Sequence, residues 1–141
     1  MPDRLTLARA FMQALPHAQS LGMILTEMGK GSATVTMPYD ARLIGDPATG
    51  VLHGGAISAL MGTASGASVM SHPSAPAGTA TLDLRIDYMR PATPGQAVTA
   101  RAVCHHVTRT VAFVRVTATD ADEARPVAMG TGTFTLEKPP A

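Results

Sequence analysis

Residues 51–70 read VLHGGAISALMGTASGASVM, and the rest of the chain is interpreted from this stretch. It is the only long segment without a proline or a charged residue, and after Gly55 its larger apolar side chains recur at mostly helical spacing. We therefore predict one buried helix of about four turns. Positions 55, 59, 62 or 63, and 66 form a stripe of small residues on its other face. Because an interior glycine costs about 1 kcal/mol relative to alanine, we expect another element to pack closely against this stripe.

The start of this helix carries the polar groups of greatest chemical interest. No Ser, Thr, Asp or Asn caps the first turn, so the amides of Gly54 and Gly55 are predicted to lack partners within the chain. Such N–H groups attract a carbonyl oxygen or an anion, and His53 stands directly before them. A simpler arrangement, in which His53 bonds to a loop and the glycines only allow a tight turn, fits the same residues.

The composition limits the classes of protein to consider. A chain of 141 residues, 45% hydrophobic and 15% charged, is expected to form one domain over residues 1–141. The net charge of +1, the lack of a basic run and the 4% aromatic content give no reason to expect nucleic acid. No run reaches the roughly 18 apolar residues of a membrane span. Residues 1–14 are predicted to be an amphipathic helix and not a signal peptide, so the cytoplasm is the expected compartment.

The residues that commonly bind metals are poorly arranged for that task. Cys104 is the only cysteine, which excludes an internal disulfide and a thiolate-rich metal site. His105 and His106 are neighbours on a predicted strand, so their side chains would face opposite sides. The acidic run 120–123 is predicted to be a solvated hairpin tip, too short for a calcium loop. We therefore expect no metal site.

Hydrophobic periodicity predicts the other elements. An N-terminal helix is expected within residues 1–18, and residues 137–141 are expected to be a tail. The most regular strand, 79–90, would direct alternate apolar residues toward the core, namely Ala80, Leu82, Leu84, Ile86 and Tyr88. The predicted strands are 21–27, 33–38, 79–90, 96–107, 111–119 and 127–136. One long helix and six antiparallel strands favour an α+β fold in which a strongly curved sheet wraps around the helix.

Two segments resemble a known family. Gly50–Ala56 with the apolar helix after it, and Thr81–Pro91, which reads TLDLRIDYMRP, together resemble the hotdog-fold acyl-CoA thioesterases of the PaaI-like, phenylacetate-pathway type. The resemblance covers roughly residues 20–136. It implies hydrolysis of the thioester of a small aromatic or short- to medium-chain acyl-CoA, with no cofactor because CoA is part of the substrate. It also implies a homodimer, often paired into a homotetramer, with active sites at the subunit interface.

The resemblance also implies roles for individual residues. The amide of Gly54 or Gly55 would polarise the thioester carbonyl, and His53 would help to hold that carbonyl or the water. Thr81, on a facing strand, would help to position the water. Three arginines could meet the phosphates of CoA: Arg85, Arg90 and Arg109.

The chain departs from the family pattern at two positions. Where the family carries a carboxylate on the helix, this chain has Gly62, and Pro47 replaces the usual asparagine before the histidine. A thioester is hydrolysed by an activated water or a carboxylate nucleophile. Asp46, beside Pro47, is one candidate for the missing carboxylate, and His53 acting as base is another. The third explanation is a non-catalytic protein that binds an acyl-CoA without hydrolysing it.

Overall fold

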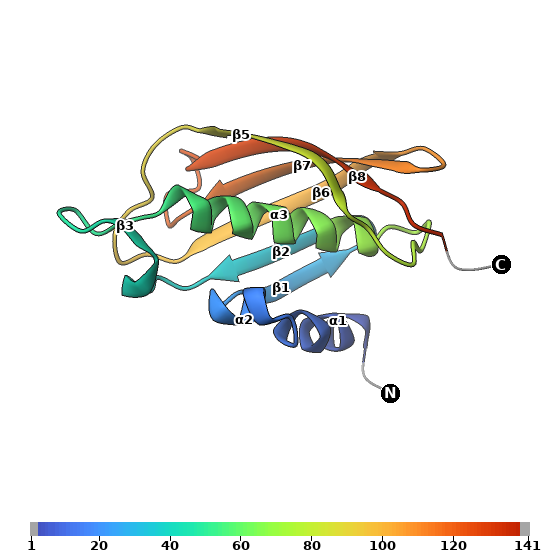
Figure 1. Cartoon of the computed structure of the whole chain (residues 1–141), viewed down its shortest axis with the longest axis horizontal. Helices are drawn as coiled ribbons and strands as arrows, with labels where there is room; N and C mark the ends of the chain where they lie inside the picture. The colour runs from blue at the N-terminus through green and yellow to red at the C-terminus, as the bar shows by residue number, and fades with distance from the viewer. Residues whose placement is uncertain (1–2, 139–141) are drawn as a thin grey trace.

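The apolar stretch that follows His53 forms the predicted long helix. In the computed structural model, which describes residues 3–138, this helix is α3, Gly54–Met70. It lies against one face of a six-stranded sheet (Figure 1). The side chains that α3 buries are Ala56, Ile57, Leu60, Met61, Ala64, Ser65, Ser68 and Val69.

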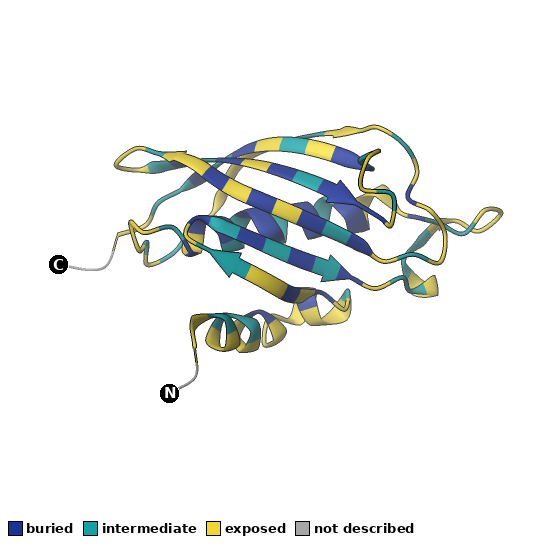
Figure 2. Cartoon of the chain, turned by 180° about the vertical axis from the view of Figure 1, so that it is seen from behind, coloured by how far each residue is buried: buried dark blue, intermediate teal, exposed yellow. Residues whose placement is uncertain are grey.

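The sheet is antiparallel throughout, in the order β1-β2-β6-β7-β8-β5. Its strands are β1 Ile24–Gly29, β2 Ser32–Met37, β5 Thr81–Tyr88, β6 Val98–Val107, β7 Val111–Thr119 and β8 Ala128–Thr135. Seen from the side away from α3, buried and exposed residues alternate along the strands (Figure 2). On β2, for example, Val35 and Met37 are fully buried while Thr34 and Thr36 lie on the open face. This period-two pattern already predicted the strands. It places the buried side chains on the face of the sheet that packs against the helix. The predicted α+β architecture is therefore confirmed.

The N-terminal region differs in detail from the prediction. The helix expected within residues 1–18 is two helices, α1 Arg4–Gln13 and α2 Pro16–Ser20. Asp3 caps the first, since its carboxylate accepts a hydrogen bond from the Thr6 amide at 2.7 Å. Pro16 takes the first position of α2, where its missing N–H costs nothing.

The loop predicted before the long helix is more regular than expected. It contains a short 3₁₀ helix, η1 Ala41–Leu43, followed by a hairpin of β3 Ile44–Asp46 and β4 Val51–Leu52. This hairpin protrudes from the end of the sheet at which α3 begins (Figure 1). Strands of two or three residues carry too few alternations to be recognised by periodicity.

Strand β5 is less buried than its sequence predicts. Leu84 and Ile86 pack partly against the core, but Ala80 is exposed and Leu82 and Tyr88 are 58% and 52% exposed. The prediction of a fully buried face is wrong because β5 is an edge strand, paired only with β8. One side of its backbone is left without a neighbouring strand.

The small-residue stripe on α3 is also less tightly covered than predicted. A Cβ atom built on Gly62 would lie 3.6 Å from Leu84 Cδ2, which is an ordinary contact. One built on Gly66 would meet nothing within 4 Å. Within one chain, therefore, the close packing expected along the stripe is absent at Gly66.

The acidic hairpin tip is another point at which the prediction is wrong. The side chain of Asp120 is fully buried, and its carboxylate accepts two hydrogen bonds from the Arg90 guanidinium, at 2.7 and 2.8 Å. It also accepts bonds from the amide and hydroxyl of Thr93. Only the neighbouring acidic residues, Asp122 and Glu123, form exposed ion pairs, with Arg125 and Arg101.

The residues considered for metal binding lie mostly at the surface. A β-bulge between Cys104 and His106 breaks the alternation assumed for this strand, and His105 and His106 are both exposed. Cys104 is buried, and burial raises the pKa of its thiol. Within residues 3–138, no three His, Cys, Asp or Glu side chains are grouped so that they could hold a metal ion.

Two further predictions concern the C-terminal tail and membrane-spanning helices. In the predicted tail, Glu137 still pairs with Gly78 as an isolated bridge, and residues 139–141 lie outside the described residues. Across the described part of the chain, no helix has both the length and the apolar character needed to cross a membrane.

Candidate active site at the start of helix α3

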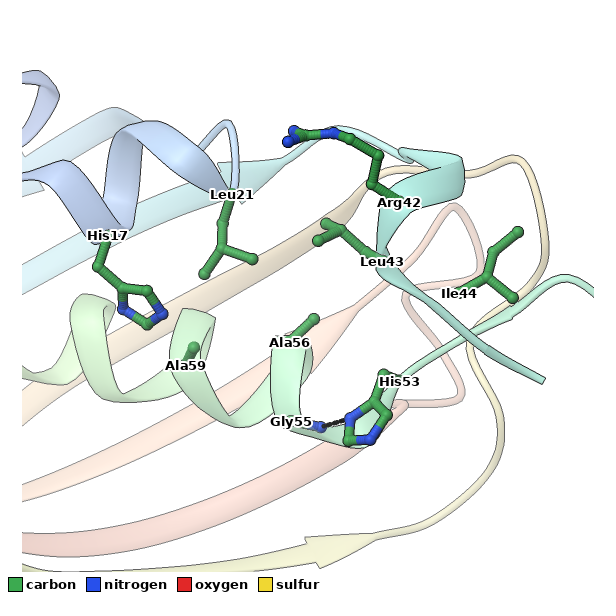
Figure 3. Close-up of a pocket in the computed structure, with 9 residues that line it drawn as sticks. All are labelled: His17, Leu21, Arg42, Leu43, Ile44, His53, Gly55, Ala56 and Ala59. Carbon is green, nitrogen blue, oxygen red and sulfur yellow. Dashed lines mark hydrogen bonds between the residues drawn. The ribbon is translucent and has the colours of Figure 1, made fainter. Parts of the chain in front are cut away.

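His53 caps the helix that it precedes. Its Nδ1 atom accepts a hydrogen bond from the Gly55 amide at 2.8 Å (Figure 3). The prediction that both glycine amides lack partners is therefore wrong for Gly55. Histidine is an uncommon cap, so the usual list of capping residues did not reveal it.

This bond determines which nitrogen of His53 carries the proton. A backbone N–H can only donate, so Nδ1 must be unprotonated, and the neutral ring bears its proton on Nε2. The exposed edge of the ring therefore presents a donor and not a lone pair. Such a group can hold a carbonyl oxygen, but it cannot take a proton from water, which argues against His53 as the base.

Two glycines make room for this arrangement. A Cβ atom on Gly55 would lie 2.9 Å from His53 Nδ1, and one on Gly45, in β3, would lie 2.7 Å from the Cα of His53. The amide of His53 also donates to the Leu43 carbonyl at 2.8 Å, which ties the residue to the end of η1. Gly45 was missed by sequence reasoning, since its importance depends on how closely β3 approaches His53.

The peptide groups of Gly54 supply the remaining polar atoms. The Gly54 carbonyl accepts a hydrogen bond from the Tyr88 hydroxyl at 2.8 Å. Its amide has no hydrogen-bond partner among residues 3–138. The Gly54 N–H and the Nε2–H of His53 are thus two exposed donors at the positive end of α3.

A cavity of about 310 Å³ opens beside these donors, between α2 and the first turns of α3 (Figure 3). His53 lies at one end of it, and the ring of His17 points toward Ala59 at the other. Arg42, on the rim, is bonded to Asp40 and to the Ser20 carbonyl. The lining residues are His17, Leu21, Arg42, Leu43, Ile44, His53, Gly55, Ala56 and Ala59, with no carboxylate among them.

Comparison with known proteins identifies the family of this chain. The family model of the thioesterase superfamily matches residues 49–127, which is more than half of the chain. The chain belongs to the thioesterase superfamily. A Halobacterium salinarum protein, named provisionally as an esterase, is 35% identical over 138 residues, covering 94% of this chain and 91% of its own.

Solved structures of other proteins share the fold. A Pseudomonas aeruginosa crystal structure is 41% identical, with a TM-score of 0.82 and coverage of 93% of this chain and 97% of its own. A mutant of the phenylacetic acid degradation protein PaaI from Thermus thermophilus is 31% identical, with a TM-score of 0.75 and coverage of 85% and 97%. The hotdog fold and the likeness to PaaI are therefore confirmed.

The candidate carboxylate of this thioesterase-superfamily chain lies outside the cavity. Asp46 is exposed in the β3–β4 hairpin, where its carboxylate accepts a hydrogen bond from the Ala48 amide at 3.0 Å. It does not line the cavity beside His53.

Thr81 is also distant from the helix start within one chain. It begins β5, whereas Tyr88, which contacts Gly54, ends it. At ~3.3 Å per residue the two ends of this strand are about 23 Å apart. A single chain therefore does not bring Thr81 to His53.

The three arginines predicted to meet the CoA phosphates differ in their hydrogen-bond partners and in their exposure. Every guanidinium nitrogen of Arg90 donates to an acceptor in its own chain, including Asp120 and the Arg125 carbonyl. These bonds give Arg90 a structural role. Arg85 forms an exposed pair with Asp87 at 3.2 Å, and Arg109 is exposed in the turn between β6 and β7. The guanidinium groups of Arg85 and Arg109 are accessible to solvent.

Proposed function

We propose that this superfamily member hydrolyses the thioester of an acyl-CoA whose acyl group is small and aromatic or of short to medium length. One observation carries the proposal: His53 and the first turn of α3, which supply the two N–H donors, border a cavity lined mostly by apolar side chains. The carbonyl oxygen of a thioester would accept both bonds, and its acyl group would enter the cavity.

The size of the cavity suits these acyl groups. At about 310 Å³ it falls at the lower end of the range for small-molecule sites, about 300–1,000 Å³. A benzene ring occupies an engineered apolar cavity of about 150 Å³. The space between Ala56, Ala59, Leu21 and Leu43 therefore suits an aromatic ring with a short linker, or a medium alkyl chain.

The two donors would act on the charge that develops during hydrolysis. Water adds to the carbonyl carbon, the C–S bond then breaks, and the departing thiolate takes up a proton to give free CoA and a carboxylic acid. Negative charge collects on the carbonyl oxygen as water adds. Fixed donors aimed at that oxygen stabilise the transition state, and a single such donor contributes about 10²–10³-fold in rate.

In this proposal, a second copy of the chain completes the site. β5 is an edge strand with an unpaired backbone, and another β5 running antiparallel to it would bring the partner subunit's Thr81 toward the end that carries Tyr88. We assign the general base to Asp46, and contacts with the CoA phosphates to Arg85 and Arg109. This arrangement is a homodimer, and two such dimers would make a homotetramer.

One observation favours a second candidate function. The cavity lining contains no carboxylate, and Gly62 stands where a carboxylate would be expected on the helix. A non-catalytic protein of this fold would bind an acyl-CoA through the same donors and the same cavity without hydrolysing it.

Thiol release from a panel of acyl-CoAs by the purified protein tests the proposal. We expect turnover with aromatic or short- to medium-chain members. Asp46→Ala should lower kcat by about 10²-fold or more, since general bases contribute about 10²–10⁴-fold. The matched control is Glu27→Ala, which removes an exposed carboxylate from β1 at the opposite edge of the sheet.

The two candidate functions differ in a second readout. A binder would release no thiol from any member of the panel, yet an acyl-CoA would raise its melting temperature. That result would refute the hydrolase. Full activity of Asp46→Ala would refute only the assignment of Asp46 as base.

A further inference from the structure

We propose that Tyr88 is a positioning residue, which together with His53 clamps the Gly54–Gly55 peptide and so fixes the direction of the Gly54 N–H. The inference rests on the proposed function of this site, in which that N–H binds the thioester carbonyl. Tyr88 lies on β5 and would touch neither substrate nor water in this role. It acts through the backbone of α3.

The two contacts hold opposite ends of one peptide group. Its carbonyl oxygen, on Gly54, accepts the Tyr88 hydroxyl hydrogen at 2.8 Å. Its N–H, on Gly55, donates to His53 Nδ1 at 2.8 Å. Because a peptide group is planar, holding both atoms fixes its orientation, and the adjoining Gly54 N–H is then constrained through a single Cα atom.

This segment needs an external clamp because two successive glycines have no side chains to restrict them. Glycine has access to more backbone conformations than any other residue, and here it occupies the first turn of a helix. The Tyr88 ring also packs against Gly54, since a Cβ atom on this glycine would lie 3.6 Å from ring atom Cε1. Both the hydroxyl and the ring of Tyr88 therefore restrain the same turn.

Tyr88 itself is held by the strand and not by the core. The residue is 52% exposed, so it contributes little to the packing of the interior. The backbone just after it is firmly anchored, because Met89 N donates to the Val127 carbonyl at 2.8 Å and Arg90 pairs with the buried Asp120. An anchored backbone with an exposed side chain suits a residue that positions a neighbouring backbone.

The chain offers a matched control for this contact. It has only two tyrosines, and the hydroxyl of the other, Tyr39, also donates to a glycine carbonyl, that of Gly50, at 2.6 Å. Tyr39→Phe and Tyr88→Phe therefore make the same chemical change. Only Tyr88→Phe removes a bond to the first turn of α3.

The first measurement is amide hydrogen exchange of Gly55 by NMR, with the ¹⁵N shift of His53 Nδ1 as a second probe. Loss of one hydrogen bond should speed Gly55 exchange about threefold to tenfold in Tyr88→Phe and move the Nδ1 signal. Tyr39→Phe should match the wild type in both probes. Melting temperature should change little in Tyr88→Phe, which separates positioning from a general loss of stability.

The second measurement is steady-state thioester hydrolysis. Tyr88→Phe should lower kcat by about threefold to tenfold and leave KM within about twofold, because the weakened contact matters most to the charged oxygen of the transition state. Unchanged Gly55 exchange in Tyr88→Phe would overturn the clamp, and so would the same kinetic loss in Tyr39→Phe. Failure of the wild type to release thiol would refute the proposed function alone, since the exchange measurement needs no substrate.

Discussion

Gly55, at the start of α3, leaves room for the ring of the neighbouring His53. A glycine in a helix normally costs stability relative to alanine, yet here a methyl group would lie 2.9 Å from His53 Nδ1 and 3.1 Å from its Cε1. The missing side chain thus allows the imidazole to fold back over the first turn. The ring then caps the helix and presents its Nε2–H outward.

Gly55→Ala is therefore expected to destabilise the protein by roughly 1 kcal/mol, the usual value of an N-cap bond. It should also lower thioester turnover, because the displaced ring no longer presents its donor. Gly66→Ala is the control, since a Cβ atom there meets nothing within 4 Å and should stabilise α3 by about 0.5–1 kcal/mol. Urea unfolding of both variants measures the difference. Equal stabilisation by the two alanines would contradict the His53 cap.

At the scale of elements, a buried ion pair connects the end of β5 to the segment that follows β7. Arg90, just after β5, and Asp120, just after β7, lie 30 positions apart and form two hydrogen bonds. The side chain of Asp120 has no exposed surface, and that of Arg90 is 16% exposed. This pair anchors the strand that carries Tyr88 and thereby supports the contact with Gly54.

Asp120→Asn should cost about 3–5 kcal/mol, because it leaves the Arg90 charge without its partner. Asp122→Asn, which removes the carboxylate of an exposed pair with Arg125, is the control and should change stability little. Urea midpoints at neutral pH measure both. A small loss in Asp120→Asn would show that the buried pair contributes little to stability.

The same pair predicts how stability depends on pH. Hydrogen bonds from Arg90 hold the pKa of the Asp120 carboxyl well below its usual value of 3.8. The unfolded chain therefore takes up this proton more readily than the folded chain does. The stabilisation is present above about pH 4 and is lost as the pH falls below it. Between about pH 5 and 2 the wild type should lose more unfolding free energy than Asp120→Asn. Parallel pH profiles for the two proteins would contradict the assignment.

At the scale of the whole molecule, the two edges of the sheet differ in whether another element covers them. β1 is covered by α1, and the Arg9 side chain donates to the Leu25 carbonyl at 2.8 Å. β5 has no such cover, and Leu82 and Met89, which lie in or beside it, are 58% and 57% exposed. Exposed edge strands are usually blocked or paired, so this edge is where we place the homodimer contact.

Leu82→Lys should therefore weaken the proposed dimer, because it sets a charge on each strand of a two-fold contact. Sedimentation equilibrium should give at least twice the 14.5 kDa chain mass for the wild type and about 14.5 kDa for the variant. Turnover should fall together with the mass, since the site would be completed across the contact. Phe11→Lys, at a 70% exposed position on α1, is the control and should keep the β5 dimer. A monomeric wild type with full activity would refute both the dimer and the shared site.

Much of the fold follows from local patterns. The stretch after His53 had to form a buried helix because it is apolar and free of proline and charge, and alternation in the stretches before and after it predicted six strands. The location of the candidate site was also predictable, since a histidine and two glycines open that helix. Periodicity depends only on neighbouring residues, so it can be read without knowing the tertiary structure.

The contacts that define the site were decided only by the tertiary structure. The Tyr88 hydroxyl reaches a carbonyl 34 positions away, and Asp120, which resembles a solvated residue in the sequence, is buried against Arg90. Even the His53 cap, which spans two residues, depends on a ring orientation that Gly45 and Gly55 permit. Sequence patterns report which side chains prefer burial. The partner that each polar group finds depends on which strands and helices meet in space.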